Sequence, residues 1–151
     1  MSTLSDMQQA PHLHYMSTQH GLIRRQQALT AGMTVKQVDA LVRHGEWVVV
    51  RRGVYATRAR WESLDPYVGR PRLQVWAATL TTTTPHFVSH DSAAYVHDLA
   101  ILAARPRLVH LTRVGVLGCR TRHGIKHHKA PVGTGQIVFV DDHPVLDIPR
   151  T

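Results

Sequence analysis

The apolar residues of the chain follow a helical spacing most clearly near residue 40. Val35, Val38, Leu41 and Val42 fall on one face of a helix and leave polar residues on the other face. The helix is short and sharply bounded, so this segment is the best-defined element in the sequence.

Both ends of this helix are marked by residue type. Thr34 suits an N-terminal cap, and Gln37, three residues later, completes the pattern of a capping box. Met33 can pack against Val38 across the first turn, and Gly45 stands where a C-terminal glycine is expected. The side chains that point away from the apolar face are Lys36, Gln37, Asp39 and Arg43.

Two further helices are expected before this one. Residues 1–9 are polar and are expected to be disordered or frayed, and Pro11 suits the first turn of a helix that runs to about His20. A second short helix is expected over residues 21–32, where the final glycine can adopt the left-handed conformation that ends a helix.

After the third helix the sequence changes to β-forming residues. Trp47 to Val50 form one run, Arg51 to Gly53 make a turn, and Val54 to Ala56 form a second run. Two short helices joined by a tight turn and followed by a two-stranded ribbon with a basic tip describe a winged helix-turn-helix. We assign it to residues 10–57.

The remainder of the chain predicts a second domain. Residues 58–70 are polar and irregular and are expected to be a linker, and residues 71–151 are expected to form an α+β domain. Its expected elements are helices over residues 71–80 and 89–99 and strands at 87–88, 107–112, 124–129, 136–140 and 144–148. The predicted fold class is therefore α+β, a winged helix-turn-helix followed by a smaller α+β domain.

Composition narrows the class of partner. The chain carries 18 Lys and Arg against 10 Asp and Glu, a formal net charge of +8, which favours a polyanion such as nucleic acid. The single cysteine, Cys119, excludes an internal disulfide and indicates a reducing compartment. Without a secretory signal or a long apolar run, we expect a cytoplasmic protein that does not enter a membrane.

Basic residues fall on every element that a winged helix presents to double-stranded DNA. The third helix fits the major groove, the ribbon tip reaches the minor groove or the backbone, and the supporting helix crosses the backbone. The candidate DNA-binding residues are Arg24, Arg25, Thr34, Lys36, Gln37, Arg43, Arg51 and Arg52.

The segment from Gly21 to Ala56, GLIRRQQALTAGMTVKQVDALVRHGEWVVVRRGVYA, resembles the N-terminal domain of AbiEi-type antitoxins of type IV toxin-antitoxin systems. The GEW and RRGVYA landmarks carry the resemblance, and SHDSAAYVHDL at residues 89–99 is similar to the segment that follows this domain in actinobacterial relatives. The resemblance implies a transcriptional regulator that binds its own promoter and represses its toxin-antitoxin operon, with a nucleotidyltransferase-like toxin as genetic partner. We also expect a homodimer or a cooperative pair.

Such relatives usually continue into another apolar helix and a longer C-terminal domain. We therefore expect the α+β domain to be truncated, with an apolar sheet face left partly exposed. The residues expected on that face are Val109, Leu111, Val138 and Val140.

No catalytic or cofactor site is expected. His123, His127 and His128 have spacing that suits a metal, but no carboxylate or cysteine cluster accompanies them. His86, His90 and His97 are taken as ordinary core or surface histidines. Ser89, His90 and Asp91 are neighbours in sequence, which argues against a catalytic triad. The prediction is a non-enzymatic protein that requires neither cofactor nor metal.

Two alternatives stay open from the sequence alone. The first is that the chain is the DNA-recognition part of a longer nuclease-like protein whose catalytic domain is absent. The second is that the winged helix binds protein, because winged helices also serve that purpose.

Residues 105–129 carry basic and no acidic side chains. That segment is either an additional surface for nucleic acid or an exposed basic strand pair.

Overall fold

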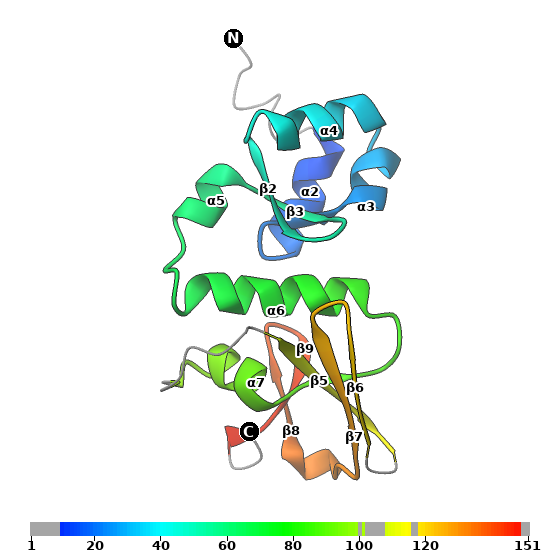
Figure 1. The fold of residues 1–151 in the computed structure, drawn as a ribbon, viewed down its shortest axis with the longest axis vertical. Helices are drawn as coiled ribbons and strands as arrows, with labels where there is room; N and C mark the ends of the chain where they lie inside the picture. Colours follow the sequence, from blue (N-terminus) through cyan, green and yellow to red (C-terminus); the bar gives the residue numbers. More distant parts are fainter. Residues whose placement is uncertain (1–9, 100, 102–107, 116–117, 149–151) are drawn as a thin grey trace. The chain divides into compact units, whose positions relative to one another are not determined.

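The computed structural model describes residues 10–99, 101, 108–115 and 118–148. The chain divides into two compact units, Met1–Asp65 and Pro66–Thr151, so the second unit is the longer one and not the smaller one expected. Figure 1 shows the elements of both units. The segment 1–9, expected to be frayed, lies outside the described residues.

The first unit is a winged helix-turn-helix, as predicted. Its three-stranded antiparallel sheet has the order β1-β3-β2. The elements are α2 (Pro11–Thr18), β1 (Leu22–Arg24), α3 (Arg25–Thr30), α4 (Val35–Arg43), β2 (Trp47–Arg51), β3 (Val54–Thr57) and α5 (Arg58–Glu62). Helices α2, α3 and α4 pack around a core of Met16, Ile23, Ala28, Val38, Trp47 and Tyr55.

The structure corrects the second predicted helix. Residues 22–24 form strand β1, and the helix begins only at Arg25. Leu22 pairs with Ala56 and Arg24 with Val54, so β1 extends the ribbon into a three-stranded sheet. Three residues are too few to show an alternating pattern, so the apolar Leu22 and Ile23 do not by themselves indicate a strand.

Two smaller differences affect the same unit. Val35, expected on the apolar face of α4, is the first helical residue and is 49% exposed, because the core contacts begin one turn later at Val38. The segment expected to be an irregular linker contains helix α5, which Thr57 caps by accepting a hydrogen bond from the Arg60 amide at 3.1 Å.

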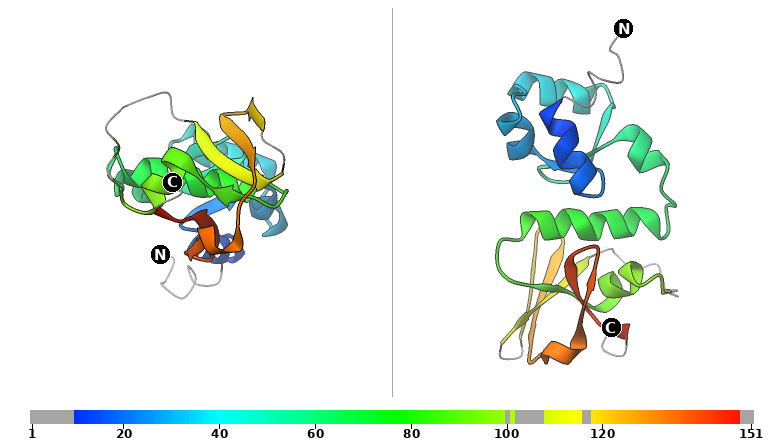
Figure 2. Two further views of the ribbon diagram at one scale, coloured as in Figure 1. Left: turned by 90° about the horizontal axis from the view of Figure 1, so that it is seen from below. Right: turned by 180° about the vertical axis from the view of Figure 1, so that it is seen from behind.

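The described residues of the second unit form a mixed six-stranded sheet with two helices, and Figure 2 shows this unit from two further sides. Its elements are α6 (Gly69–Thr81), β4 (Phe87–Val88), α7 (His90–Val96), β5 (Val109–Val114), β6 (Gly118–Arg122), β7 (Ile125–Ala130), a 3₁₀ turn (Thr134–Gln136), β8 (Ile137–Val140) and β9 (His143–Leu146). The strand order is β6-β7-β5-β4-β9-β8. Both helices contact β5.

The sheet is better covered than the sequence predicts. Val109 is 7% exposed and Leu111 is fully buried, because α6 packs against β5. Only β8, at the edge of the sheet, keeps an exposed apolar residue from the predicted set, Val138 at 38%. The expectation of an uncovered apolar face is therefore wrong for β5.

Candidate nucleic-acid interface

Helix α4 has a fixed N-terminal end. The Gln37 amide donates a hydrogen bond to the Thr34 hydroxyl at 3.2 Å, and the Gln37 side-chain oxygen accepts one from the Thr34 amide at 2.8 Å. This reciprocal pair is the predicted capping box. It fixes where α4 begins and therefore which side chains the helix exposes.

The outer face of α4 is basic. Val38 is fully buried in the core, whereas Lys36 and Arg43 are exposed at the two ends of the helix. Gln37 is also exposed, and although its carbonyl oxygen is used by the cap, its amide NH₂ group still offers two donors. A helix with this polar edge has the dimensions and donors needed to read the major groove.

A second group of basic residues gathers where β1 meets the ribbon tip. The register Arg24–Val54 brings β1 beside the turn, and the Arg25 amide donates a hydrogen bond to the Gly53 carbonyl at 2.8 Å. Gly53 has φ of +76°, a conformation that glycine adopts without strain. Arg24, Arg25, Arg51 and Arg52 are called the arginine cluster from here on.

The members of the arginine cluster have different environments. Arg24 and Arg52 are exposed. Burial lowers the pKa of Arg51, which is half-buried beside the turn. Arg25 forms an ion pair with Asp39 of α4 at 2.9 Å and donates a hydrogen bond to the Tyr55 hydroxyl at 3.2 Å. These two partners raise the pKa of Arg25, so this side chain first serves to join α3, α4 and β3.

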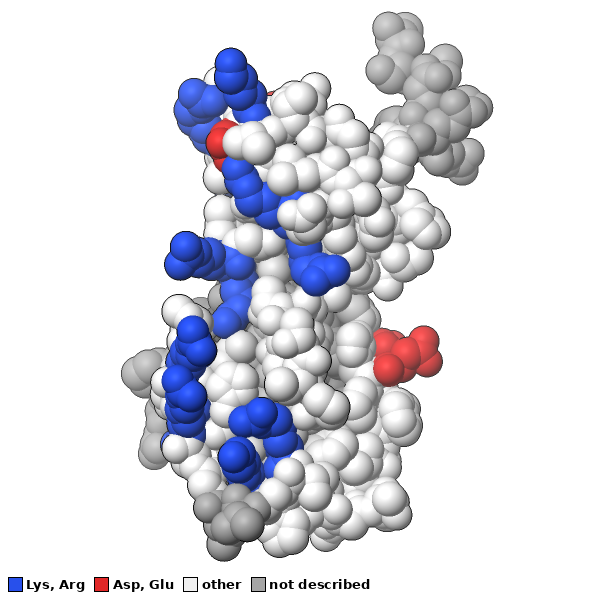
Figure 3. Space-filling view, turned by 90° about the vertical axis from the view of Figure 1, so that its right-hand side faces the viewer, with Lys and Arg blue, Asp and Glu red and all other residues white. Residues whose placement is uncertain are grey.

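Figure 3 shows Lys and Arg side chains on one side of the first unit, with little acidic surface among them. Asp39 is the acidic residue of α4, and it is paired with Arg25. The surface formed by α4 and the arginine cluster is therefore strongly positive, which attracts a polyanion at long range and holds phosphates at short range.

Helix α5 adds two arginines that the sequence reasoning did not use. Arg58 donates to the Gly45 carbonyl and pairs with Glu62 at 3.5 Å. Arg60 donates to the His20 carbonyl at 3.2 Å. Both side chains hold loops of the first unit together, so they have a structural task that accounts for their position.

The structure thus brings the eight predicted residues onto two neighbouring parts of one unit. Thr34, Lys36, Gln37 and Arg43 belong to α4 and its cap, and the other four form the arginine cluster. Thr34 and Gln37 are engaged in capping, and Arg25 is engaged with Asp39. The residues with the most accessible charges are Arg24, Lys36, Arg43 and Arg52.

Comparison with known proteins agrees with this geometry. Residues 16–58 match the family described as transcriptional regulator, AbiEi antitoxin. No curated protein matches the chain. Within the described part of the chain, no helix combines the length and the apolar character needed to cross a membrane. The matched residues contain all of α3, α4 and the ribbon, so the winged helix-turn-helix of the N-terminal unit is similar to that of the AbiEi antitoxin transcriptional regulators.

Proposed function

We propose that this chain is a DNA-binding regulator that occupies its own promoter and represses a type IV toxin-antitoxin operon. The observation that carries the proposal is the exposed basic edge of α4 next to the arginine cluster, within residues that match a family of transcriptional regulators. The chain would act by occupying DNA and would carry out no reaction itself.

In this proposal α4 enters the major groove. Lys36 and Arg43 contact base edges or phosphates, and the Gln37 amide donates to a base while its oxygen holds the cap. Thr34 contributes through the cap and through its hydroxyl, which still has a proton to donate.

The arginine cluster contacts the DNA backbone beside that groove. Arg52 lies at the ribbon tip and suits a phosphate or the minor groove, and Arg24 lies on the adjacent strand. Arg51 supports the same contact from a half-buried position, and Arg25 holds α4 in place through Asp39.

The family implies the rest of the biological setting. A nucleotidyltransferase-like toxin encoded next to this chain is the genetic partner, and a homodimer would match two half-sites one helical turn apart. Because a regulator of this kind has to reach the promoter of its own operon, the proposal includes a cytoplasmic location.

The test is a footprint of the full chain on the DNA upstream of its own reading frame. We expect protection of a defined site and weaker binding to a random duplex of equal length and base composition. In a plot of log K against log salt, we expect a slope of about −4 to −5 per copy. This value assumes one phosphate contact from each of five accessible or half-buried basic residues, Arg24, Lys36, Arg43, Arg51 and Arg52.

Replacing both Lys36 and Arg43 by alanine should remove the preference for the upstream site, while circular dichroism stays unchanged because both side chains are exposed. Arg58→Ala is the comparison for the loss of a basic side chain outside α4, and its melting temperature is measured as well because Arg58 donates to the Gly45 carbonyl and pairs with Glu62. A slope near zero for the wild type, or full preference in the double variant, would refute the proposal.

A further inference from the structure

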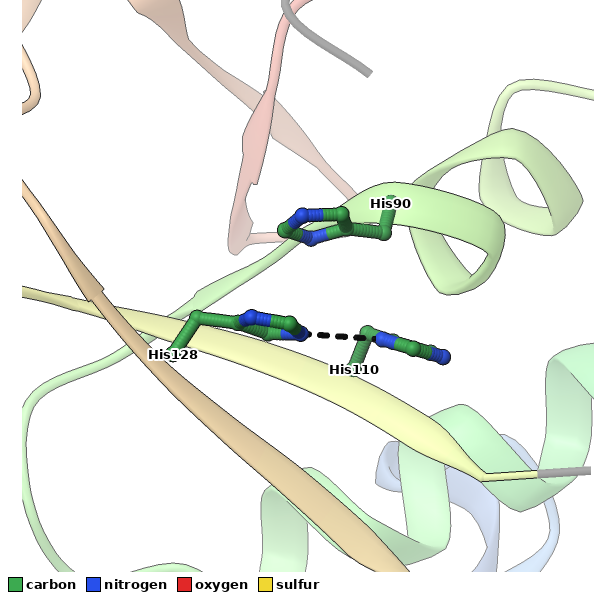
Figure 4. Close-up of side chains that lie close together, drawn as sticks. All are labelled: His90, His110 and His128. Atoms are coloured by element: carbon green, nitrogen blue, oxygen red, sulfur yellow. Dashed lines mark hydrogen bonds between the residues drawn. The ribbon is translucent and has the colours of Figure 1, made fainter. Parts of the chain in front are cut away.

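Three histidines from separate segments meet on one face of the second unit's sheet, as Figure 4 shows. His110 lies on β5, His128 lies on β7, and His90 is the first residue of α7. The parallel strands pair His110 with Lys126 and Thr112 with His128. Because residues two apart on a strand share a face, both histidines point to the same side of the sheet.

Buried hydrogen bonds hold α7 against that face. The Thr112 hydroxyl donates to the Ser89 hydroxyl at 2.7 Å, and the His110 amide donates to the Ser92 hydroxyl at 2.8 Å. Ser89, Ser92 and Thr112 are all buried. Since Ser89 immediately precedes His90, these bonds fix the backbone that carries the third imidazole.

The distances among the three rings are short. The Nδ1 atom of His110 lies 3.0 Å from the Nε2 atom of His128, and the His90 and His128 rings stack with centroids 4.0 Å apart. One ring nitrogen from each residue lies within 4.8 Å of the other two. Zinc–nitrogen bonds of 2.0–2.1 Å place tetrahedral ligands about 3.3 Å apart, so His110 and His128 already have nearly the required spacing.

We propose that His90, His110 and His128 form a binding site for a divalent late-transition-metal ion such as Zn²⁺. The site belongs to the second unit and is independent of the DNA-binding surface proposed for the first unit. Imidazole nitrogen is the ligand type that these ions favour, and three protein ligands leave one tetrahedral position for water or an anion.

One side chain must move for the ion to bind. The stacked rings of His90 and His128 are nearly parallel, at 19°, so their nitrogen lone pairs do not converge on one point. The His90 side chain is exposed, and a rotation about its side-chain torsions turns one nitrogen toward the other two. The ion would then replace the hydrogen bond between His110 and His128.

The surroundings suit neutral imidazoles. Burial lowers the pKa of both His110 and His128, and the neighbouring histidines lower it further, which favours the ligand form of each ring. His90 also has φ of +50°, an uncommon backbone conformation outside glycine. The hydroxyl of Ser89 lies 3.0 Å from its Nδ1 atom and can orient the ring when Nε2 binds the ion.

Sequence spacing pointed to other sets of histidines. His127 and His128 are adjacent on β7 and therefore point to opposite faces of the sheet. His86 and His97 are not members of the cluster, whereas His110, which no spacing connected to His90, is its third member. The parallel register of β5 with β7 is the information that the sequence pattern lacks.

A bound ion would join α7 to β5 and β7, so it should raise the melting temperature of the protein. The test uses the full chain, stripped with a chelator and titrated with Zn²⁺ by calorimetry. We expect saturable binding of one ion per chain and an increase in melting temperature at saturation. His90→Ala and His128→Ala should each weaken the Zn²⁺ affinity at least about tenfold, because even the loss of an outer-shell partner of a metal ligand has about that effect.

Two control variants separate this site from nonspecific binding. His127→Ala removes the adjacent histidine on the opposite face and should bind Zn²⁺ as the wild type does. Cys119→Ser removes the exposed thiol of the residue that lies opposite His128 on β6, and this variant should also retain binding. Because His90 is exposed and outside the sheet, His90→Ala remains informative even if His128→Ala fails to fold.

Three results would overturn the proposal. The first is no saturable Zn²⁺ binding by the wild type, and the second is undiminished binding by His90→Ala. The third is that a folded His127→Ala or Cys119→Ser variant loses as much Zn²⁺ affinity as His90→Ala does. DNA binding by the first unit would be unaffected by any of them, so this test is separate from that of the regulator proposal.

Discussion

Arg52 is the residue whose replacement tests the ribbon contact most directly. It is exposed in the two-residue turn between β2 and β3, where its neighbour Gly53 is bonded to the start of α3. The turn itself is therefore held by backbone, and Arg52→Ala removes a charge without removing a contact that maintains the fold. We expect an unchanged melting temperature.

The expected loss of affinity follows from counterion release. One phosphate contact contributes about 0.9 to the slope of log K against log salt, so at about 0.1 M salt its removal weakens binding roughly eightfold. A contact to phosphate carries no sequence information. The loss should therefore be equal for the upstream site and for a random duplex.

Fluorescence anisotropy at several salt concentrations measures both quantities. Arg25→Ala is the informative comparison, because Arg25 is tied to Asp39 and Tyr55, and its removal should lower the melting temperature. An unchanged slope for Arg52→Ala would show that the ribbon tip does not contact phosphate. A loss confined to the upstream site would show instead that Arg52 reads bases.

Three further predictions concern single residues of the two units. Thr34→Ala should lower the free energy of unfolding of the first unit by about 1 kcal/mol in a denaturant titration, and Thr34→Ser should restore it, because either hydroxyl caps α4. Asp39→Asn should strengthen binding to random DNA and steepen the slope of log K against log salt by up to about 0.9, because it removes a negative charge and releases Arg25. An unchanged slope would show that Arg25 does not contact phosphates. Burial lowers the pKa of His128 from its usual 6.5 to about 4, with a further effect from His90, His110, Lys126 and His127, so the folded chain binds fewer protons than the unfolded chain. The contribution of neutral His128 to folding stability is complete above pH 6.5 and is lost as the pH falls toward 4. In metal-free thermal melts, the melting temperature of His128→Asn should therefore decrease less over this pH range than that of the wild type.

Helix α4 illustrates what the sequence could predict. Its cap, its core residue Val38 and its C-terminal glycine follow from local features, and the structure contains Thr34, Gln37 and Gly45 in the expected roles. Local hydrogen bonds within one turn determine such elements, so no knowledge of distant contacts is needed.

Strands β1 and β6 could not be predicted from the sequence pattern. β1 has three residues, and all five residues of β6 are exposed, so neither carries an alternating apolar pattern. Backbone pairing with β3 and β7 defines them instead. The predicted exposure of the apolar face of β5 was wrong for a related reason, because the cover for Leu111 comes from α6, which precedes the sheet in the chain.

The same kind of pairing assembles both clusters on which the proposals rest. Arg24 joins Arg52 only because β1 pairs with β3, and the two fully buried residues Leu22 and Ile23 hold β1 in that register. Leu22 and Ile23 point to opposite faces and both are buried, so a shift of one residue would move Arg24 or Gly21 into a buried position, and the register is therefore strongly determined. The position of Arg24 at the ribbon tip is thus a consequence of core packing, and the proposed phosphate contact requires no ordering of a flexible loop.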